Sequence, residues 1–385
     1  MRTRRRVALY LDIRSNYDQG IARGVIRYAK EHGTWHLFGH GWMLSEIQNP
    51  SGWNGDGIIS RIKNTEEAQA LSAIAVPVVD VAGTLSLPNG SSVTNDDFST
   101  GRIVGEHLLS CVFPRFGFCG ASGSRWSDER LDGFLAALNL KRADVACFEK
   151  PLEWWWEKLA RDRSLQRWLK SLRTPLGIMA CNDAAGVKLT GACQALGIAV
   201  PRQIGVVGVD NEEVLCELSA PSLSSVPCDC EKIGYEAGAM LDRMMQKRIK
   251  NVTPVRVPPK PLVVRASSDT LAIDDEAVAI ALRFIRGNTD LSINVSDVLR
   301  AVPLCRRSLE MRFRRALGHT ILDEIRRTRL EHACRLLQNT DLPAAKVALA
   351  AGFSSHRRFH TVFVEAMKMK PPEYRILSRQ CHLAP

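Results

Sequence analysis

Short apolar runs alternate with amphipathic stretches over residues 7–268. Runs of about four to eight apolar residues bounded by polar ones are typical of strands buried in a parallel sheet. The sequence predicts such strands at 7–13, 57–60, 76–81, 116–120, 176–181 and 204–210. Apolar residues at helical spacing predict crossover helices at 19–31, 99–111, 127–139, 154–172, 184–196 and 231–247. This alternation predicts an α/β fold in which helices connect parallel strands.

The pattern changes after a proline-rich stretch. Pro254, Pro258, Pro259 and Pro261 favour extended backbone, because proline lacks the N–H that a helix needs. From residue 274 onward the chain is helical in pattern, with turns marked by glycine or proline. We therefore expect a first domain over 1–268, a linker over 269–273 and an all-helical domain over 274–385.

The positive charge of the chain is concentrated near its C-terminus. Residues 293–385 hold 17 Lys+Arg against 8 Asp+Glu, a surplus of +9. The other residues hold the remaining 35 of 52 basic and 33 of 41 acidic side chains, a surplus of +2. A basic domain beside a nearly neutral one is typical of proteins that bind a polyanion such as nucleic acid.

The sequence gives no support for a disulfide-rich or metal-binding protein, an exported or membrane protein, or an enzyme. The 11 cysteines are scattered, as in a reducing cytoplasm, and the close pair Cys228 and Cys230 has no second pair to complete a metal site. The apolar run after residue 6 is too short for an export signal or a membrane span. No G-x-S-x-G, H-E-x-x-H or G-x-G-x-x-G motif is present. We therefore expect a cytoplasmic protein that is not an enzyme and has no metal or cofactor.

An internal repeat is visible in the basic domain. Two apolar stripes with i, i+4, i+8 spacing lie 50 residues apart, Leu309, Phe313 and Leu317, then Phe359, Phe363 and Met367. Each stripe follows a short predicted helix, at 295–302 or 344–351, and a tight turn. Two ordinary helical hairpins are one interpretation. The other is a pair of helices that read the major groove of DNA through exposed polar side chains.

The second of these units resembles the helix-turn-helix motif of AraC/XylS-type regulators. The resemblance rests on the run VALAAGFSS at 347–355, followed by Phe359, Phe363, Pro371, Glu373, Tyr374 and Arg375. It implies two recognition helices, joined by a long helix at 321–338, in successive major grooves of operator DNA. The implied DNA-binding residues are Arg306, Arg307, Glu310, Met311, His356, Arg357, His360 and Thr361.

Three positions depart from that family's pattern. Pro303 stands where a turn glycine is usual, and Cys305 stands where a serine usually caps the first recognition helix. Lys368 replaces the glycine expected after the second recognition helix. Because cysteine is a poor N-cap and a left-handed lysine is strained, these changes affect the local geometry of both units.

Polar side chains in the first domain fall at or just after predicted strand ends, where open α/β sheets bind ligands. They are Asp96, Arg130, Asn182, Asp183 and Asp210. Carboxylates and amides accept hydrogen bonds from a polyol and arginine donates to it, while Tyr17 and Trp126 would cover its apolar face. For any one residue, a helix cap or a loop carboxylate is the alternative interpretation.

The first domain resembles the two-lobed type I periplasmic-binding-protein fold of the lactose-repressor family. The resemblance rests on VTND at 93–96, DERLDGF at 128–134, CND at 181–183 and VVGVDNEE at 206–213. A sensor of this kind before an AraC-type domain resembles the layout of xylose-operon regulators, and the Tyr17 and Asp18 pair strengthens that resemblance. The resemblance implies that Tyr17 and Asp18 are among the ligand-binding residues. This implies a homodimer that binds a xylose-like sugar and activates transcription through RNA polymerase. A different sugar, a non-sugar polyol or a repressor remains open.

Overall fold

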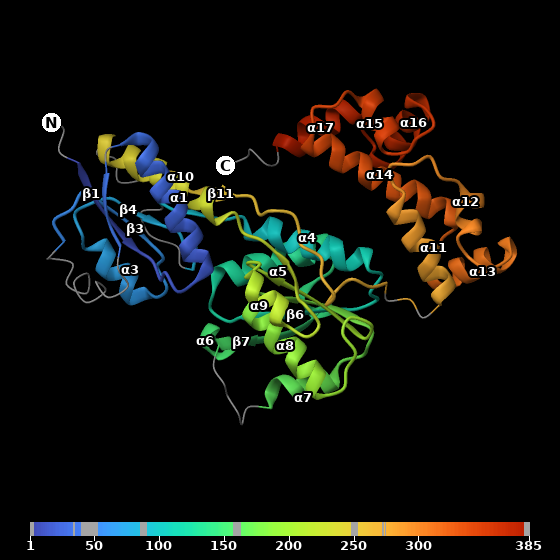
Figure 1. Ribbon diagram of the computed structural model, residues 1–385, viewed down its shortest axis with the longest axis horizontal. Helices are drawn as coiled ribbons and strands as arrows, with labels where there is room; N and C mark the ends of the chain where they lie inside the picture. The colour runs from blue at the N-terminus through green and yellow to red at the C-terminus, as the bar shows by residue number, and fades with distance from the viewer. Residues whose placement is uncertain are drawn as a thin grey trace. The chain divides into compact units, whose positions relative to one another are not determined.

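The computed structural model describes residues 4–33, 35–39, 53–84, 91–156, 163–247, 253–271, 273 and 275–380. It divides into two compact units, Met1–Ala272 and Ile273–Pro385 (Figure 1). The first unit contains two large parallel sheets covered by helices, with a small two-stranded sheet besides, and the second unit is all-helical in its described residues. The expected fold class, a two-lobed α/β domain followed by a helical domain, is therefore confirmed. None of the described helices has the length and apolar character needed to cross a membrane.

The first lobe is built on a four-stranded parallel sheet of order β2-β1-β3-β4. Its strands are β1 (Arg5–Tyr10), β2 (Trp35–Phe38), β3 (Gly57–Ser60) and β4 (Val78–Asp80). Its helices are α1 (Asn16–His32), α3 (Thr65–Ser72) and α10 (Cys230–Lys247). The strand expected over 7–13 ends at Tyr10, and Ile13 beyond it is 54% exposed.

The second lobe has a five-stranded sheet of order β10-β9-β8-β6-β7. Its strands are β6 (Phe116–Ala121), β7 (Ala146–Lys150), β8 (Leu176–Ala180), β9 (Ile204–Val209) and β10 (Ser224–Val226). Its helices are α4 (Asp97–Ser110), α5 (Arg125–Leu138), α6 (Leu152–Trp156), α7 (Ser164–Ser171), α8 (Asp183–Ala195) and α9 (Glu213–Leu218). Because β6, β8 and β9 are completely buried, their sequences are continuous apolar runs.

Among the described residues the chain passes between the lobes three times. It leaves the first lobe after β5 (Val93–Asn95), returns after β10, and leaves again after β11 (Val255–Val257). β5 and β11 pair in parallel, and Val263 then pairs with Ser225 beside β10. These crossings put residues from distant parts of the sequence at the junction of the two lobes.

The helix expected over 154–172 is wrong as a single element. The structure has two separate helices, α6 and α7, and Arg163 directly before α7 is not helical. Residues 157–162 lie outside the described part of the chain. Trp154 and Trp155 pack edge-on against Phe148 of β7, with ring centroids 5.6 and 5.9 Å away. The tryptophans therefore serve the core of this lobe.

Helices α4 and α5 approach each other unusually closely, and two glycines permit it. A Cβ on Gly101 would lie 1.9 Å from the Arg130 carbonyl oxygen, and one on Gly133 would lie 1.9 Å from that of Phe98. No side chain fits at either distance, so the two backbones are in direct contact. This packing holds α5 against the start of α4, where Asp97 lies.

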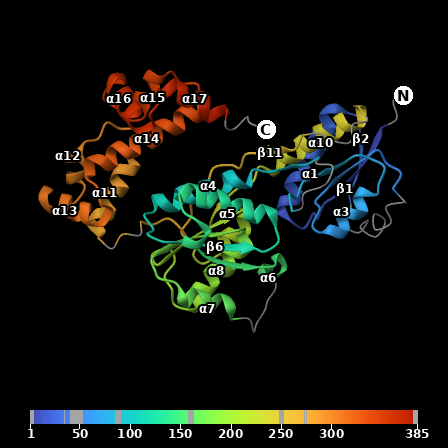
Figure 2. The ribbon, with the colours of Figure 1, turned by 180° about the vertical axis from the view of Figure 1, so that it is seen from behind.

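The second unit places two short helix pairs on either side of a long helix (Figure 2). Its helices are α11 (Glu276–Gly287), α12 (Val295–Arg300), α13 (Arg306–Leu317), α14 (Ile321–Asn339), α15 (Ala344–Ala350), α16 (His356–Met367) and α17 (Pro371–Gln380). Leu309, Phe313, Phe359 and Phe363 of the predicted stripes are all fully buried. The repeat seen in the sequence is thus a repeat of helix pairs, α12–α13 and α15–α16.

Candidate ligand site and nucleic-acid interface

Arg130 on α5 lies at the centre of a buried charge cluster in the second lobe. Its Nε donates to Asp97 Oδ1 at 2.8 Å, and a terminal nitrogen donates to the Cys181 carbonyl. The other terminal nitrogen lies 3.7 Å from Asp210 Oδ1. Burial lowers the pKa of Arg130, but the nearby Asp97 and Asp210 raise it by more than burial lowers it. The pKa of Arg130 therefore lies above its ordinary value. The guanidinium is therefore charged and has acceptors on several sides.

Asp210 follows β9 in a strained backbone conformation. Its φ is +102°, and Asn211 after it has a φ of +50°. Residues other than glycine rarely adopt positive φ, and such strain is concentrated at functional sites. The Asp210 side chain is still 24% exposed and meets Cys228 Sγ at 3.6 Å. Burial raises the pKa of Asp210, while Arg130 opposes that rise.

Tyr17, Asp18 and Arg61 form a second cluster, on the first lobe. Asp18 Oδ2 accepts hydrogen bonds from the Asp12 backbone N–H at 2.8 Å and from Arg61 at 3.3 Å. The Arg61 guanidinium lies 5.1 Å from the Tyr17 ring centroid. Asp18 Oδ1 is buried and has no hydrogen-bond partner among the described residues. A buried oxygen of this kind is costly unless a bound molecule satisfies it.

The two clusters interact electrostatically. Burial raises the pKa of Asp210, and both Arg130 of its own lobe and Arg61 of the other lobe lower it. Tyr17 is also affected from across the junction, since burial, Cys230, Cys228 and Asp97 all raise its pKa. Tyr17 and Cys230 also pack against the apolar cores of both lobes. The two clusters therefore form one candidate site, with donors and acceptors on both lobes.

Three residues predicted to bind the ligand are engaged in holding the fold. Asp96 caps α4 by accepting from the Ser99 N–H, and Asn182 caps α8 by accepting from the Ala185 N–H, both at 2.9 Å. Asp183 is buried and accepts from Ser225 Oγ at 2.6 Å and from the Glu212 N–H at 2.8 Å. Ligand contact by these three side chains stays a prediction.

Two members of the site were missed in the sequence. Arg61 directly follows β3, so the strand-end rule that selected the other residues would have selected it too. Asp97 stands beside the chosen Asp96, but only Asp97 pairs with Arg130. Trp126 was predicted, and its ring centroid lies 4.7 Å from the Arg130 guanidinium carbon.

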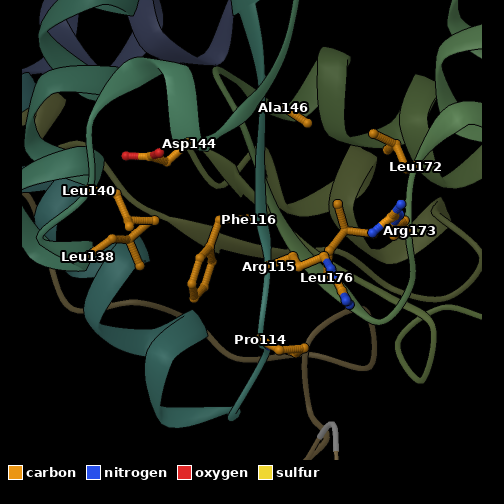
Figure 3. A pocket seen from close by; sticks show the side chains of 10 residues that line it. All are labelled: Pro114, Arg115, Phe116, Leu138, Leu140, Asp144, Ala146, Leu172, Arg173 and Leu176. Atoms are coloured by element: carbon orange, nitrogen blue, oxygen red, sulfur yellow. The ribbon is translucent and has the colours of Figure 1, made fainter.

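A separate pocket of about 320 Å³ lies at the opposite end of the second lobe's sheet. Figure 3 shows the side chains that line it, Pro114, Arg115, Phe116, Leu138, Leu140, Asp144, Ala146, Leu172, Arg173 and Leu176. Phe116 and Leu176 are the first residues of β6 and β8, whereas Cys181 and Asp210 follow the last residues of β8 and β9. The pocket therefore does not belong to the charged site.

Helix α13 has a buried apolar face and a polar outer face. Arg306 and Arg307 are exposed, and Met311 is 66% exposed. Arg306 Nε also donates to Glu310 at 2.8 Å, four residues on. An exposed methionine between arginines suits a DNA groove, where an apolar side chain contacts thymine methyl groups and arginine contacts guanine.

Helix α16 repeats this arrangement with different side chains. His356, Arg357 and Thr361 are exposed, and His360 is partly buried. The Thr361 hydroxyl donates to the Arg357 carbonyl at 3.1 Å. Within the described ranges no cluster of three or more His, Cys, Asp or Glu side chains is placed to hold a metal ion.

Two of the three departures from the motif have a visible local effect, a missing side-chain cap at Cys305 and a left-handed backbone at Lys368. Ser355 caps α16 by accepting from the Arg358 N–H at 3.2 Å, whereas the Cys305 side chain makes no capping hydrogen bond to α13. Lys368 ends α16 in a left-handed conformation with φ +57°. The Pro303 backbone lies in the turn between α12 and α13. Both units keep the helix-turn-helix arrangement.

Three protein families match this chain. Residues 6–92 match the XylR N-terminal domain, residues 105–268 a periplasmic binding protein-like domain, and residues 299–376 a helix-turn-helix domain. The matches follow the architecture of the two units.

Similar proteins match over nearly the whole length of the chain. The xylose operon regulatory protein of Escherichia coli K12 is 32% identical over 99% of both chains. Its counterpart from Haemophilus influenzae is 28% identical over 96% of this chain and 98% of its own. A solved structure of a xylose-binding transcription activator is 30% identical, with a TM-score of 0.61 over 98% of this chain and 99% of that one.

Proposed function

The chain belongs to the family of xylose operon regulatory proteins, and we propose that it activates a pentose-catabolic operon in response to a xylose-like sugar. Proteins of this family are transcription regulators with a sugar-sensing domain and a DNA-binding domain. The sugar binds between the two lobes of the first unit and changes operator binding by the second. The active form is a cytoplasmic homodimer that contacts RNA polymerase.

The observation that carries the ligand proposal is Asp18 Oδ1, which is buried beside Arg61 and Tyr17 and has no hydrogen-bond partner in the described part of the chain. A sugar hydroxyl is a donor that satisfies this oxygen. Arg130 and Asp210 on the other lobe supply a charged donor and a charged acceptor, and Trp126 supplies an aromatic face. Such a site is chemically complete for a small polyol, which presents both donors and acceptors around an apolar ring.

A ligand held by both lobes stabilises one arrangement of the lobes over others. A ligand changes DNA affinity only through such a difference in affinity between states. The proposed effector site contains residues of the first unit alone, and the proposed base readers are on α13 and α16. Sugar binding and operator binding are therefore expected to be separable by mutation.

The test of the ligand site is Asp210→Asn. The variant keeps the volume of the side chain and loses its charge, so we expect affinity for D-xylose to fall by about 1.5 to 3 kcal/mol, the range for a hydrogen bond to a charged group. Operator affinity without sugar should be unchanged. Titration calorimetry measures the first quantity and fluorescence anisotropy with an operator duplex the second, and a panel of pentoses, hexoses and polyols identifies the preferred effector.

Asp132→Asn is the matched control, because Asp132 is exposed on α5 of the same lobe. It should leave sugar affinity and the sugar-dependent change in DNA binding as in the wild type. A variant Asp210→Asn that keeps the full sugar-dependent change would show that the effector binds elsewhere.

The DNA interface is tested by Arg307→Ala and Arg357→Ala. Each should weaken binding to the cognate operator by about 1 to 3 kcal/mol if the arginine makes paired hydrogen bonds to a base. Binding to random DNA should change much less, because it depends on phosphate contacts that other cations still supply. Equal losses on both kinds of DNA would assign these arginines to the phosphate backbone and contradict the role in base reading.

A further inference from the structure

The loop between α11 and α12, residues 288–294, packs against the turn of the second helix-turn-helix unit. Gly352 lies in that turn with a φ of +72°. A Cβ on Gly352 would lie 2.5 Å from the Leu291 carbonyl oxygen and 3.0 Å from that of Thr289. The loop backbone therefore contacts the turn at a distance that only glycine permits.

Arg329, in the middle of α14, joins the same two regions. It donates to the Ile293 carbonyl at 2.6 Å, two residues before α12 begins. Its guanidinium carbon lies 6.0 Å from the ring centroid of Phe353, which packs 5.2 Å from the ring of Phe359 on α16. Arg329 thus connects the start of the first helix pair to the recognition helix of the second.

The position of Arg329 is electrostatically unfavourable. Burial and the nearby Arg358 both lower its pKa. Its Nε is buried and makes no hydrogen bond to any described residue. Burying a charge with incomplete hydrogen bonding costs stability, so an aliphatic side chain of similar size would be tolerated by the fold. What the arginine adds is a directional bond to the loop.

Gly352, Arg329 and the loop at 288–294 form a contact between the two helix-turn-helix units, which we call the joint. We propose that the joint holds α13 and α16 at one fixed separation. The number of base pairs between the two DNA segments that these helices read, the two blocks, is then part of operator specificity. Arg329 and Gly352 act as positioning residues for the two recognition helices. The inference rests on the proposed DNA-reading role of α13 and α16. One inserted base pair moves the second block by about 3.4 Å and rotates it by roughly 35°, which a rigid pair of helices does not follow.

The experiment uses full-length protein and a duplex that the wild-type protein selects from a random library. Derivatives of this duplex carry one or five extra base pairs between the blocks protected by α13 and α16. Wild-type affinity, measured by fluorescence anisotropy, should fall at least about tenfold with one inserted pair, because the second contact loses its high effective concentration. For Arg329→Met and Gly352→Ala we expect weaker binding to the parent duplex and an insertion penalty below about threefold.

Two matched control variants separate the effect of breaking the joint from the effects of losing a positive charge and of straining the backbone. Arg335→Met removes an exposed cation from the same helix. Gly318→Ala imposes the same left-handed strain, since Gly318 has a φ of +79°, and none of the described residues has an atom within 4 Å of an added Cβ. Both controls should keep the wild-type spacing penalty. Arg307→Ala and Arg357→Ala, measured on the parent duplex, test separately whether α13 and α16 read bases. A failure of that proposed function is therefore distinguishable from a failure of the proposal about the joint.

The proposal is overturned if Arg329→Met, with a wild-type circular dichroism spectrum, keeps the tenfold spacing penalty. It is also overturned if the two matched controls lose that penalty, because the effect would then come from lost charge or from strain. Gly352→Ala provides an independent second measurement of the same contact.

Discussion

Arg130→Met is expected to lower the free energy of unfolding of the first unit by about 3 to 5 kcal/mol, because removing one partner of a buried ion pair leaves the other charge uncompensated. The charge left behind is Asp97, a buried carboxylate that Arg130 contacts at 2.8 Å. Burial raises the pKa of Asp97, and among the groups that lower this pKa Arg130 has the largest effect. Urea unfolding followed by tryptophan fluorescence measures the loss. All 8 tryptophans precede residue 170, so the signal reports on the first unit alone.

The double variant Asp97→Asn with Arg130→Met should recover much of that stability, since neither side chain is then a buried unpaired charge. Arg102→Met is the control, because Arg102 forms an exposed pair with Glu106 on α4 and such pairs contribute about 1 kcal/mol or less. A loss below 1 kcal/mol for Arg130→Met alone would contradict the role of the pair in the fold. All variants without Arg130 should also lose sugar binding.

Stability of the first unit should fall as pH rises from about 4 to 7, through Asp183. Burial, and after it Asp210, raises the pKa of Asp183 to about 7. In the unfolded chain a carboxyl has a pKa near 4, so between these two values the unfolded state ionises while the folded state keeps its proton. Above pH 7 both states are ionised, and the contribution no longer changes. Below pH 4 both are protonated and the penalty is absent.

Asp183→Asn removes this titration. The free energy of unfolding of the variant, relative to wild type, should therefore rise by about 2 to 3 kcal/mol between pH 5 and pH 7.5. The measurement is a series of urea titrations at fixed ionic strength, followed by tryptophan fluorescence. Asp132→Asn, an exposed carboxyl on α5, should show a constant difference from wild type. Parallel curves for Asp183→Asn and wild type would show that Asp183 ionises normally.

The proposed DNA-binding residues and the proposed sugar-binding residues were predicted from different kinds of sequence pattern. The pattern for the DNA-binding residues is local, and the pattern for the sugar-binding residues is not. The proposed base readers lie on helices with a regular apolar pattern, so that the buried Leu309 and Phe359 on one face imply exposed Arg307 and Arg357 on the other. The proposed effector site instead joins side chains from strand ends that are far apart in the chain. Its members follow from topology, and the sequence predicts the edge of the sheet but not which residue there points inward.

The sequence alone determined the two architectures, the repeat of helix pairs and the position of the basic domain, because each follows from local periodicity and charge. Only the tertiary structure decided the choice between neighbours such as Asp96 and Asp97. The first caps α4 and the second pairs with Arg130, since the contact of α4 with α5 at Gly101 and Gly133 turns Asp97 toward the arginine. The burial of Asp18 Oδ1 without a partner among the described residues, and the contact of Gly352 with Leu291, likewise depend on distant segments that packing brings together. Spacing along a chain does not encode such distances, because they depend on how whole helices and sheets approach one another.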